Sequence, residues 1–286
     1  KYLVTNFAYG TGPYLRTTEL ALAFNDELEK RGHERLGIIA PLVYGEKQKR
    51  IMAEEFDTNE IIFDEKLGKI LGSVFYGDNT YEAALRKWID TCKEASQSAH
   101  EHLKKTYGDS IAVELNRSPR IRYDIAPTYF TTFGYIAEIL ENVANVSYEK
   151  VSVNRSLLKQ GVETANWIES QAKIHAVAYP ATFSWQKKYK PRYATEILIP
   201  PIMRPYPGNS EKIDPGIFVT ITGIPGLERL YTEAKQLGLR LYSNDTKAVA
   251  GSAWALPHII PNPNIAFQFA RSGWGSVWLS MMSGTP

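Results

Sequence analysis

The stretch that decides the fold lies in the first forty residues: Tyr2-Leu-Val-Thr-Asn-Phe7, a glycine-containing loop from Ala8 to Pro13, an amphipathic segment, and Leu36-Gly-Ile-Ile-Ala40. In the amphipathic segment, Leu20, Phe24 and Leu28 fall on one face of a helix that ends near Arg31-Gly32. The two apolar runs read as strands. Strand, tight loop, helix and strand together predict a right-handed βαβ unit, which is the start of a parallel sheet.

The same order of elements returns near the end of the chain. Ile217-Phe-Val-Thr-Ile-Thr222 is predicted as a strand and Gly223-Ile-Pro-Gly226 as a loop. A helix with Leu227, Leu230, Tyr231, Ala234 and Leu237 on one face follows, and then a strand over 239–243. A second βαβ start indicates a second Rossmann-like domain. The fold class expected is therefore α/β, with two Rossmann-like domains whose parallel sheets face each other across a cleft.

Composition agrees with a two-domain globular protein. The chain has 286 residues, of which 44% are hydrophobic and 22% charged, and one cysteine, Cys92, so no internal disulfide is possible. A net charge of +2 is too small to indicate a nucleic-acid partner. With no long apolar run and a single thiol, the expected location is cytoplasmic. A proline-rich stretch near 200–215 is expected to connect a domain over 1–207 to one over 208–286.

The middle of the first domain is mostly helical in pattern. A long polar helix is predicted over 81–105 and another over 131–143, and such insertions normally shape a substrate cleft. Further strands of the first sheet are expected over 110–115, 121–125 and 175–178.

A small-residue turn after the last predicted strand is suited to binding phosphate. Gly273 and Gly275 allow close approach of the backbone to an anion, and Ser276 is expected to cap the helix that follows. Arg271 adds a fixed cation beside the turn. An alternative is that Trp274 and Trp278 are core aromatics and the glycines only turn the chain.

Other motifs argue against several classes of site. Gly10-Thr-Gly-Pro-Tyr14 lacks the third glycine of a dinucleotide fingerprint, and the second strand ends in Ala40-Pro41 where that fold places an acid. The loop either faces a substrate or only lets strand meet helix. His100 and His102 are two positions apart on a helix and cannot chelate one metal from it. No metal site is expected.

A short basic and aromatic cluster has two interpretations. Its cations, Lys187, Lys188, Lys190 and Arg192, either form a solvated connection or contact an anionic lipid surface or a phosphorylated acceptor. The second interpretation would place the protein peripherally at a membrane.

Three segments together resemble the GT-B glycosyltransferases. Gly10-Thr-Gly-Pro-Tyr14 with the helix after it, then Glu29-Lys-Arg-Gly-His33, resembles the opening loop and helix of that family. Ala255-Leu-Pro-His258 resembles its loop near the nucleotide base. Ser272-Gly-Trp-Gly-Ser276, followed by Ser283-Gly-Thr-Pro286, resembles its donor-phosphate segment.

The resemblance implies an enzyme, of hexosyltransferase type, that moves a sugar from a nucleoside diphosphate sugar to a carbohydrate, lipid-linked or small-molecule acceptor. It needs no cofactor or metal. The first domain would hold the acceptor, and the second, which by this resemblance is truncated at Pro286, would hold the donor. The acceptor-side loop would comprise Gly10, Thr11, Gly12 and Tyr14, and the donor-binding residues would be Gly223, Trp254, His258, Arg271, Ser272, Gly273, Gly275 and Ser276.

The sequence also departs from the family pattern at three positions. Arg271 stands where the family has a donor-site histidine, and Leu279 stands where it has a ribose-binding glutamate. Pro13 or Tyr14 holds the place of the catalytic histidine of many inverting members, so Tyr14 is the one candidate for a catalytic group. Two alternatives therefore stay open: a sugar-nucleotide epimerase of the same fold, and a catalytically degenerate binding subunit.

Overall fold

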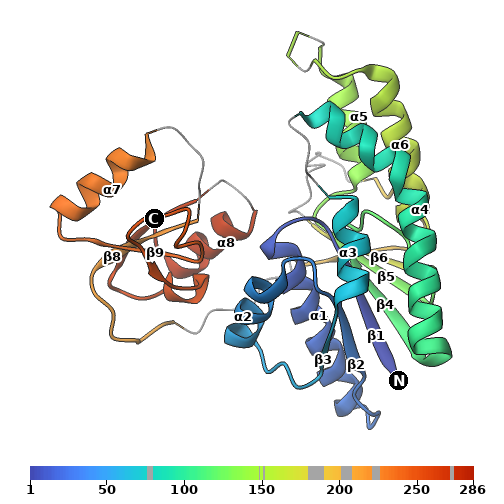
Figure 1. Cartoon of the computed structure of the whole chain (residues 1–286), viewed down its shortest axis with the longest axis horizontal. Helices are drawn as coiled ribbons and strands as arrows, with labels where there is room; N and C mark the ends of the chain where they lie inside the picture. The colour runs from blue at the N-terminus through green and yellow to red at the C-terminus, as the bar shows by residue number, and fades with distance from the viewer. Residues whose placement is uncertain are drawn as a thin grey trace. The chain divides into compact units, whose positions relative to one another are not determined.

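A computed structural model describes residues 1–75, 80–147, 149–150, 152–179, 190–200, 208–220, 226–270 and 274–286. The chain divides into two compact units, Lys1–Ile202 and Met203–Pro286. Each unit is built around its own parallel sheet (Figure 1). Among the described helices, none is long and apolar enough to cross a membrane.

The N-terminal unit contains a seven-stranded sheet in the order β3-β2-β1-β4-β5-β6-β7. Every pairing in it is parallel. The strands are β1 (Tyr2–Phe7), β2 (Gly37–Pro41), β3 (Ile61–Asp64), β4 (Ile111–Arg117), β5 (Thr128–Thr132), β6 (Ile174–Ala178) and β7 (Glu196–Ile199). The first three strands are added in one direction, from β1 to β3, and the chain then returns to place β4 on the other side of β1. The order of the strands therefore reverses between β1 and β4, although all of the strands are parallel. Crevices outside the carboxyl ends of strands at such a reversal are the usual binding sites of these folds.

The described residues of this unit form the α-helices α1 (Thr11–Lys30), α2 (Gly45–Glu55), α3 (Glu65–Ser73), α4 (Tyr81–Tyr107), α5 (Ile136–Asn145) and α6 (Arg155–Glu169). A short 3-10 turn, η1 (Gly108–Ser110), joins α4 to β4. Right-handed crossovers put the helix between β1 and β2 on one face and those after β3 on the other. Figure 1 shows α4 along one side of the sheet with α5 and α6 beside its N-terminal end.

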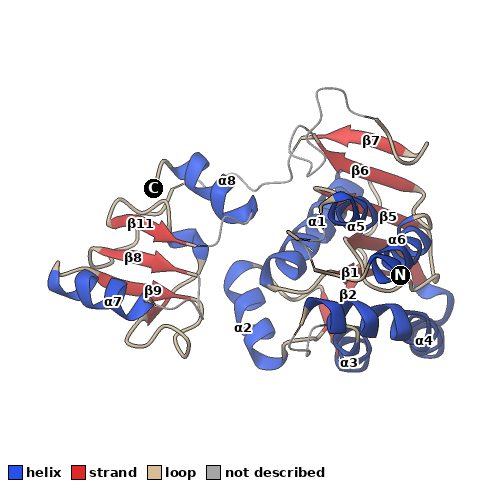
Figure 2. Ribbon diagram, turned by 90° about the horizontal axis from the view of Figure 1, so that it is seen from above, coloured by secondary structure: helices blue, strands red, loops and turns tan. Residues whose placement is uncertain are grey.

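The C-terminal unit has a four-stranded parallel sheet in the order β10-β9-β8-β11 (Figure 2). Its strands are β8 (Gly216–Val219), β9 (Arg240–Ser243), β10 (Ala253–Trp254) and β11 (Ile265–Phe269). The helices are α7 (Leu227–Gln236), the 3-10 turn η2 (Pro257–Ile259) and α8 (Trp274–Ser283). Two apolar clusters form its core. One has Ile217, Val219 and Leu241 at its centre, and the other includes Phe218 and Leu279.

Both predicted βαβ units are present, and so is the long helix, as α4. Two predictions in the N-terminal unit are wrong. Residues 121–125 are not a strand, because they form the crossover from β4 to β5: Ile121 and Tyr123 are fully buried, and the hydroxyl of Tyr123 donates to the carbonyl of Thr5. The helix predicted over 131–143 begins only at Ile136, because the residues up to Thr132 pair in β5.

Candidate functional site

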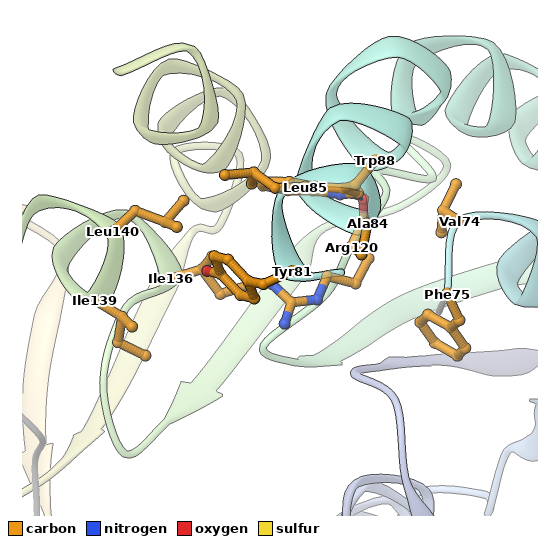
Figure 3. Close-up of a pocket in the computed structure, with 10 residues that line it drawn as sticks. All are labelled: Val74, Phe75, Tyr81, Ala84, Leu85, Trp88, Arg120, Ile136, Ile139 and Leu140. Carbon is orange, nitrogen blue, oxygen red and sulfur yellow. Dashed lines mark hydrogen bonds between the residues drawn. The ribbon is translucent and has the colours of Figure 1, made fainter. Parts of the chain in front are cut away.

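An apolar pocket lies where α4 and α5 begin and where the chain leaves β4. Its cavity volume is about 100 Å³, and further space at its mouth is open to solvent. Since α5 follows β5 and the loop at Arg120 follows β4, the pocket belongs to the carboxyl side of the first sheet. Its walls come from the end of α3, the first turns of α4 and the first turns of α5 (Figure 3): Val74, Phe75, Tyr81, Ala84, Leu85, Trp88, Arg120, Ile136, Ile139 and Leu140.

Trp88 and Arg120 are held together at one wall of this pocket. The indole Nε1 of Trp88 donates to the carbonyl of Arg120 at 2.8 Å. The guanidinium of Arg120 lies 5.6 Å from the centroid of the same indole ring, a cation–π arrangement. Trp88 is 5% exposed. Figure 3 shows the guanidinium directed toward Tyr81, so the pocket has one charged group within an apolar lining.

A buried carboxyl group supports the first turn of α5 behind the pocket. Oε1 of Glu169 accepts from the backbone N–H of Ile136 at 2.6 Å, where the free N–H groups and dipole of α5 favour a carboxylate. Burial nevertheless raises the pKa of Glu169 to about 7, while the N–H groups of Ile136 and Ala137 and the charges of Arg192 and Arg120 oppose that rise. Glu169 therefore fixes Ile136 in the wall of the pocket and titrates close to neutrality.

The loop predicted to face the acceptor adjoins this pocket. Gly10 has φ of 114°, which favours glycine, and its N–H donates to the hydroxyl of Tyr44 at 2.7 Å. The ring of Tyr9 packs edge-on against Phe75, with 5.6 Å between ring centroids, and Phe75 lines the pocket. Thr11 and Gly12 form the start of α1. The structure thus brings the loop and the pocket together through Tyr9, a residue that the sequence analysis did not single out.

Tyr14 is placed differently from what a catalytic group would require. Its side chain is 2% exposed and packs against Phe7 and Tyr44. Burial raises the pKa of its phenol well above the ordinary range, which keeps the hydroxyl protonated at neutral pH. Tyr14 is therefore a core residue, and the structure argues against it as a general base.

Half of the predicted donor-binding residues, namely Gly223, Arg271, Ser272 and Gly273, lie outside the described residues. Gly275 and Ser276 lie in the first turn of α8, which begins at Trp274. The prediction that Ser276 caps this helix is therefore wrong, because the helix starts two residues earlier. As a first-turn residue, Ser276 has a backbone N–H that the helix itself does not satisfy. Its carbonyl accepts from Nε2 of Gln268 at 2.7 Å, which ties the first turn of α8 to β11.

Leu279, which stands at the position of the family's ribose-binding glutamate, is a buried residue. It is 5% exposed and packs with Phe218, Ile265 and the other members of the second apolar cluster. Its side chain therefore faces the core of the unit. Leucine at this position is explained by packing, without reference to a ribose.

Trp254 and His258 are both predicted to lie near a nucleotide base. In the structure, Trp254 belongs to a strand of the second sheet and His258 to a 3-10 turn. Trp254 pairs with Ser243 at the end of β10. His258 lies in η2 with its Nε2 3.5 Å from a carboxylate oxygen of Glu211, and its carbonyl accepts from Asn209 at 3.1 Å. Those contacts connect His258 to the segment that leads into β8.

The basic cluster is only partly described, since Lys187 and Lys188 lie outside the described residues. Lys190 is exposed. Arg192 has a structural role within the N-terminal unit. Its guanidinium donates to both carboxylate oxygens of Glu141, at 2.8 and 2.9 Å, and also to the side-chain oxygen of Asn166. A surface role for Arg192 in contacting lipid is therefore not supported.

Within the described ranges, no group of three or more His, Cys, Asp or Glu side chains could hold a metal ion. The two helical histidines serve the structure of the N-terminal unit. His100 contacts the carbonyl of Tyr123 at 2.9 Å, and His102 pairs with the buried carboxylate of Asp64 at 2.8 Å.

No sequence motif marks the residues that line the pocket. Trp88 lies on the helix that was predicted over 81–105, and the helical region was expected to shape a cleft. The available signal was an indole on an otherwise polar helix. Arg120 could not be found in this way, because its place depends on how the chain leaves β4.

Comparison of the structure with solved structures identifies the fold. The chain superposes over its whole length on the glycosyltransferase UGT2 of Phytolacca americana, with a TM-score of 0.53, 11% identity and 80% of that chain covered. The glycotransferase of kitacinnamycin gives a TM-score of 0.54, 12% identity and 79% coverage of that chain. The spinosyn rhamnosyltransferase SpnG, solved with thymidine diphosphate, gives 0.50, 14% and 79%.

These similarities define the class of fold. The chain has the GT-B fold of glycosyltransferases, with two Rossmann-like units, as the resemblance in the sequence implied. No model of a protein family matches the sequence, and no curated protein matches it.

Proposed function

We propose that the protein transfers a sugar from a nucleoside diphosphate sugar to a small apolar acceptor. The observation that carries this proposal is the apolar pocket at the carboxyl side of the first sheet, in a chain with the GT-B fold. A concave pocket lined mostly by apolar and aromatic side chains, with few polar groups, is typical of small-molecule sites. One neighbour, UGT2, has been solved with UDP-2-fluoro-glucose and pterostilbene (TM-score 0.51, 9% identity), an acceptor in keeping with such a pocket.

In this proposal the C-terminal unit binds the donor through the segment from Arg271 to Ser276, which includes the first turn of α8. Departure of the diphosphate builds negative charge, which the first-turn N–H groups of α8 and the guanidinium of Arg271 would stabilise without a metal. The neighbour SpnG with thymidine diphosphate supports a nucleoside diphosphate as the ligand class. The loop at Gly10 to Gly12 and the ring of Tyr9 would border the acceptor.

The experiment with the sharpest outcome measures nucleoside diphosphate binding by calorimetry. We expect Arg271→Ala to weaken binding of UDP or TDP at least about tenfold, or about 1.4 kcal/mol, because a charge-assisted contact to phosphate is lost. Arg229→Ala is the matched control, since Arg229 lies on α7 with its side chain 87% exposed. Equal binding by the wild type and Arg271→Ala would remove Arg271 from the donor site.

Turnover separates this proposal from the two alternatives. The protein is incubated with UDP-glucose or a TDP-deoxysugar, with and without pterostilbene as an apolar acceptor, and products are followed by mass spectrometry and chiral chromatography of the sugar. A glycoside formed only with acceptor supports transfer. Conversion of the sugar without acceptor would indicate an epimerase, and binding without either product across a donor panel would indicate a binding subunit.

A further inference from the structure

The guanidinium of Arg120 differs from the neighbouring arginines in its partners. Arg122 binds the carboxylate of Asp124 at 2.7 Å and the carbonyl of Trp167 at 2.9 Å, and Arg192 binds Glu141. Among the described residues, no carboxylate lies within ion-pair distance of Arg120, and its guanidinium lies 5.6 Å from the centroid of the Trp88 ring. Arg120 therefore brings five N–H donors to a pocket whose other walls are apolar or aromatic.

The buried carboxyl group of Glu169 feels the charge of Arg120 but forms no hydrogen bond with it. Oε1 of Glu169 is occupied by the N–H of Ile136. Its Oε2 is buried without a hydrogen-bond partner among the described residues, so Arg120 does not donate to it. The charge of Arg120 favours ionised Glu169 only through space, and burial opposes that ionisation. With no carboxylate paired to it among the described residues, the guanidinium of Arg120 can bind the carboxylate of a ligand.

The remaining walls define the rest of the ligand. Leu85, Ile136 and Leu140 are buried aliphatic side chains, and Trp88 and Tyr81 present aromatic rings (Figure 3). Flat apolar molecules pack well against such surfaces. A carboxylate on such a molecule would meet the planar fork of Arg120, which matches carboxylate geometry with two parallel hydrogen bonds.

We infer that the pocket binds a planar apolar acid, and that Arg120 is the residue that selects its carboxylate over a neutral group. This inference rests on the proposed function in that it names the acceptor class of the same pocket. It concerns binding alone, so it can be tested without any sugar donor.

The test uses matched pairs of aromatic probes: benzoate and benzamide, 2-naphthoate and 2-naphthamide, anthracene-2-carboxylate and its amide. Binding of each to the full chain is measured by calorimetry. We expect at least one acid to bind about tenfold or more tightly than its amide, as one charge-assisted contact implies. In Arg120→Gln that preference should fall to about twofold or less, with binding of the amide unchanged. Equal binding of every acid and amide by the wild type, or binding of none of the probes, would overturn the inference.

Two further variants guard against misfolding and general charge effects. Ile139→Asp places a negative charge at the pocket rim, where the native side chain is 37% exposed, so the fold should be kept while acid binding weakens and amide binding does not. Arg86→Gln removes a cation from α4 that does not line the pocket, with a side chain 56% exposed, and should keep the acid preference. Loss of the preference in Arg86→Gln to the same extent as in Arg120→Gln would refute a specific role for Arg120.

Failure of this inference is distinguishable from failure of the proposed function. Transfer of sugar to a neutral acceptor, with no acid preference in binding, would overturn the role of Arg120 and leave glycosyl transfer standing. An acid preference that depends on Arg120, with no nucleoside diphosphate binding, would support the role of Arg120 and overturn the proposed glycosyl transfer.

Discussion

Both sheets are parallel and have a similar strand order, β3-β2-β1-β4 in one and β10-β9-β8-β11 in the other, yet the cores of the two units differ in chemistry. In the N-terminal unit, the carboxyl groups of Asp64, Glu114 and Glu169 are buried. In the described part of the C-terminal unit, the buried polar residues are the uncharged Ser243, Asn262 and Thr285. The same arrangement of strands therefore accommodates a core with buried ionisable groups in one unit and, among the described residues, a core without them in the other.

The polar core of the N-terminal unit is concentrated where the order of the strands reverses. Asn6 on β1 and Asn116 on β4 are direct neighbours in register, and Glu114 lies on the same face of β4. Nδ2 of Asn116 donates to Glu114 at 3.1 Å, and Nδ2 of Asn6 donates to the carbonyl of Ile121 at 2.9 Å. One oxygen of each of these three side chains has no donor among the described residues. A protonated Glu114 would supply one of the missing donors.

The largest change in the free energy of unfolding is expected from a substitution in the apolar core of the C-terminal unit. Leu279→Glu restores the residue type that the family pattern has at this position, but it buries a charge in the cluster around Phe218. We expect a loss of about 4 kcal/mol in the free energy of unfolding and no gain in nucleotide binding, because the charge has no partner. Urea unfolding followed by circular dichroism, together with calorimetry for UDP, measures both.

Val277→Glu is the matched control for this comparison. Val277 lies two residues earlier on α8 and is 38% exposed, so the same change should alter stability by about 0.5 kcal/mol or less. A stable Leu279→Glu variant that binds UDP more tightly than the wild type would show instead that this side of α8 is open to a ligand.

The fold could be predicted because it is encoded locally. The apolar runs at Tyr2 and Ile217, with glycine-containing loops and 3.6-residue periodicity after them, determine βαβ units without reference to distant residues. The segment 121–125 has the sequence pattern of a strand for a physical reason. Alternating apolar residues bury equally well in a strand or in a crossover that lies against a sheet, and pattern alone does not separate the two.

The second effect concerns Glu114, a buried carboxyl group that contributes to the pH dependence of the stability of the N-terminal unit. Burial raises the pKa of Glu114 from 4.5 in the unfolded chain to about 7 in the fold. The folded state therefore binds more protons between these values, so the stabilising contribution is complete below about pH 4.5 and is lost as pH rises through about 7. The difference corresponds to about 3 kcal/mol.

Glu114→Gln keeps an oxygen that can accept from Asn116 and removes the titration. We expect the variant to match the wild type near pH 4 and to be more stable by up to about 3 kcal/mol near pH 8, measured by urea unfolding at each pH. Part of the slope should remain, because the pKa of Glu169 is also raised to about 7. Glu101→Gln, an exposed position on α4, is the control and should leave the slope unchanged. An unaltered slope in Glu114→Gln would show that Glu114 is ionised in the fold.

The candidate site was less predictable than the fold, because its residues come together only in three dimensions. Phe75, Trp88, Arg120 and Ile136 belong to four separate segments, and none has a sequence motif. Tyr14 was found by its place in a motif, but a motif cannot show that α1 turns this side chain into the core. In the same way, the family pattern could not show that the side chain of Leu279 on α8 faces the core of the C-terminal unit.

The smallest effect tests a contact inside the N-terminal unit. Arg192 connects the segment before β7 to α5 through Glu141 and to α6 through Asn166, and its side chain is 23% exposed. Arg192→Gln should lower the free energy of unfolding by about 2 kcal/mol, since charge-assisted hydrogen bonds are lost and Glu141 is left without its partner. Lys190→Gln, two residues earlier and exposed, should change it by about 0.5 kcal/mol or less. If both variants were neutral in stability but weakened binding to vesicles of anionic lipid, the basic cluster would be a membrane contact after all, and the pairing of Arg192 with Glu141 would carry little weight in the fold.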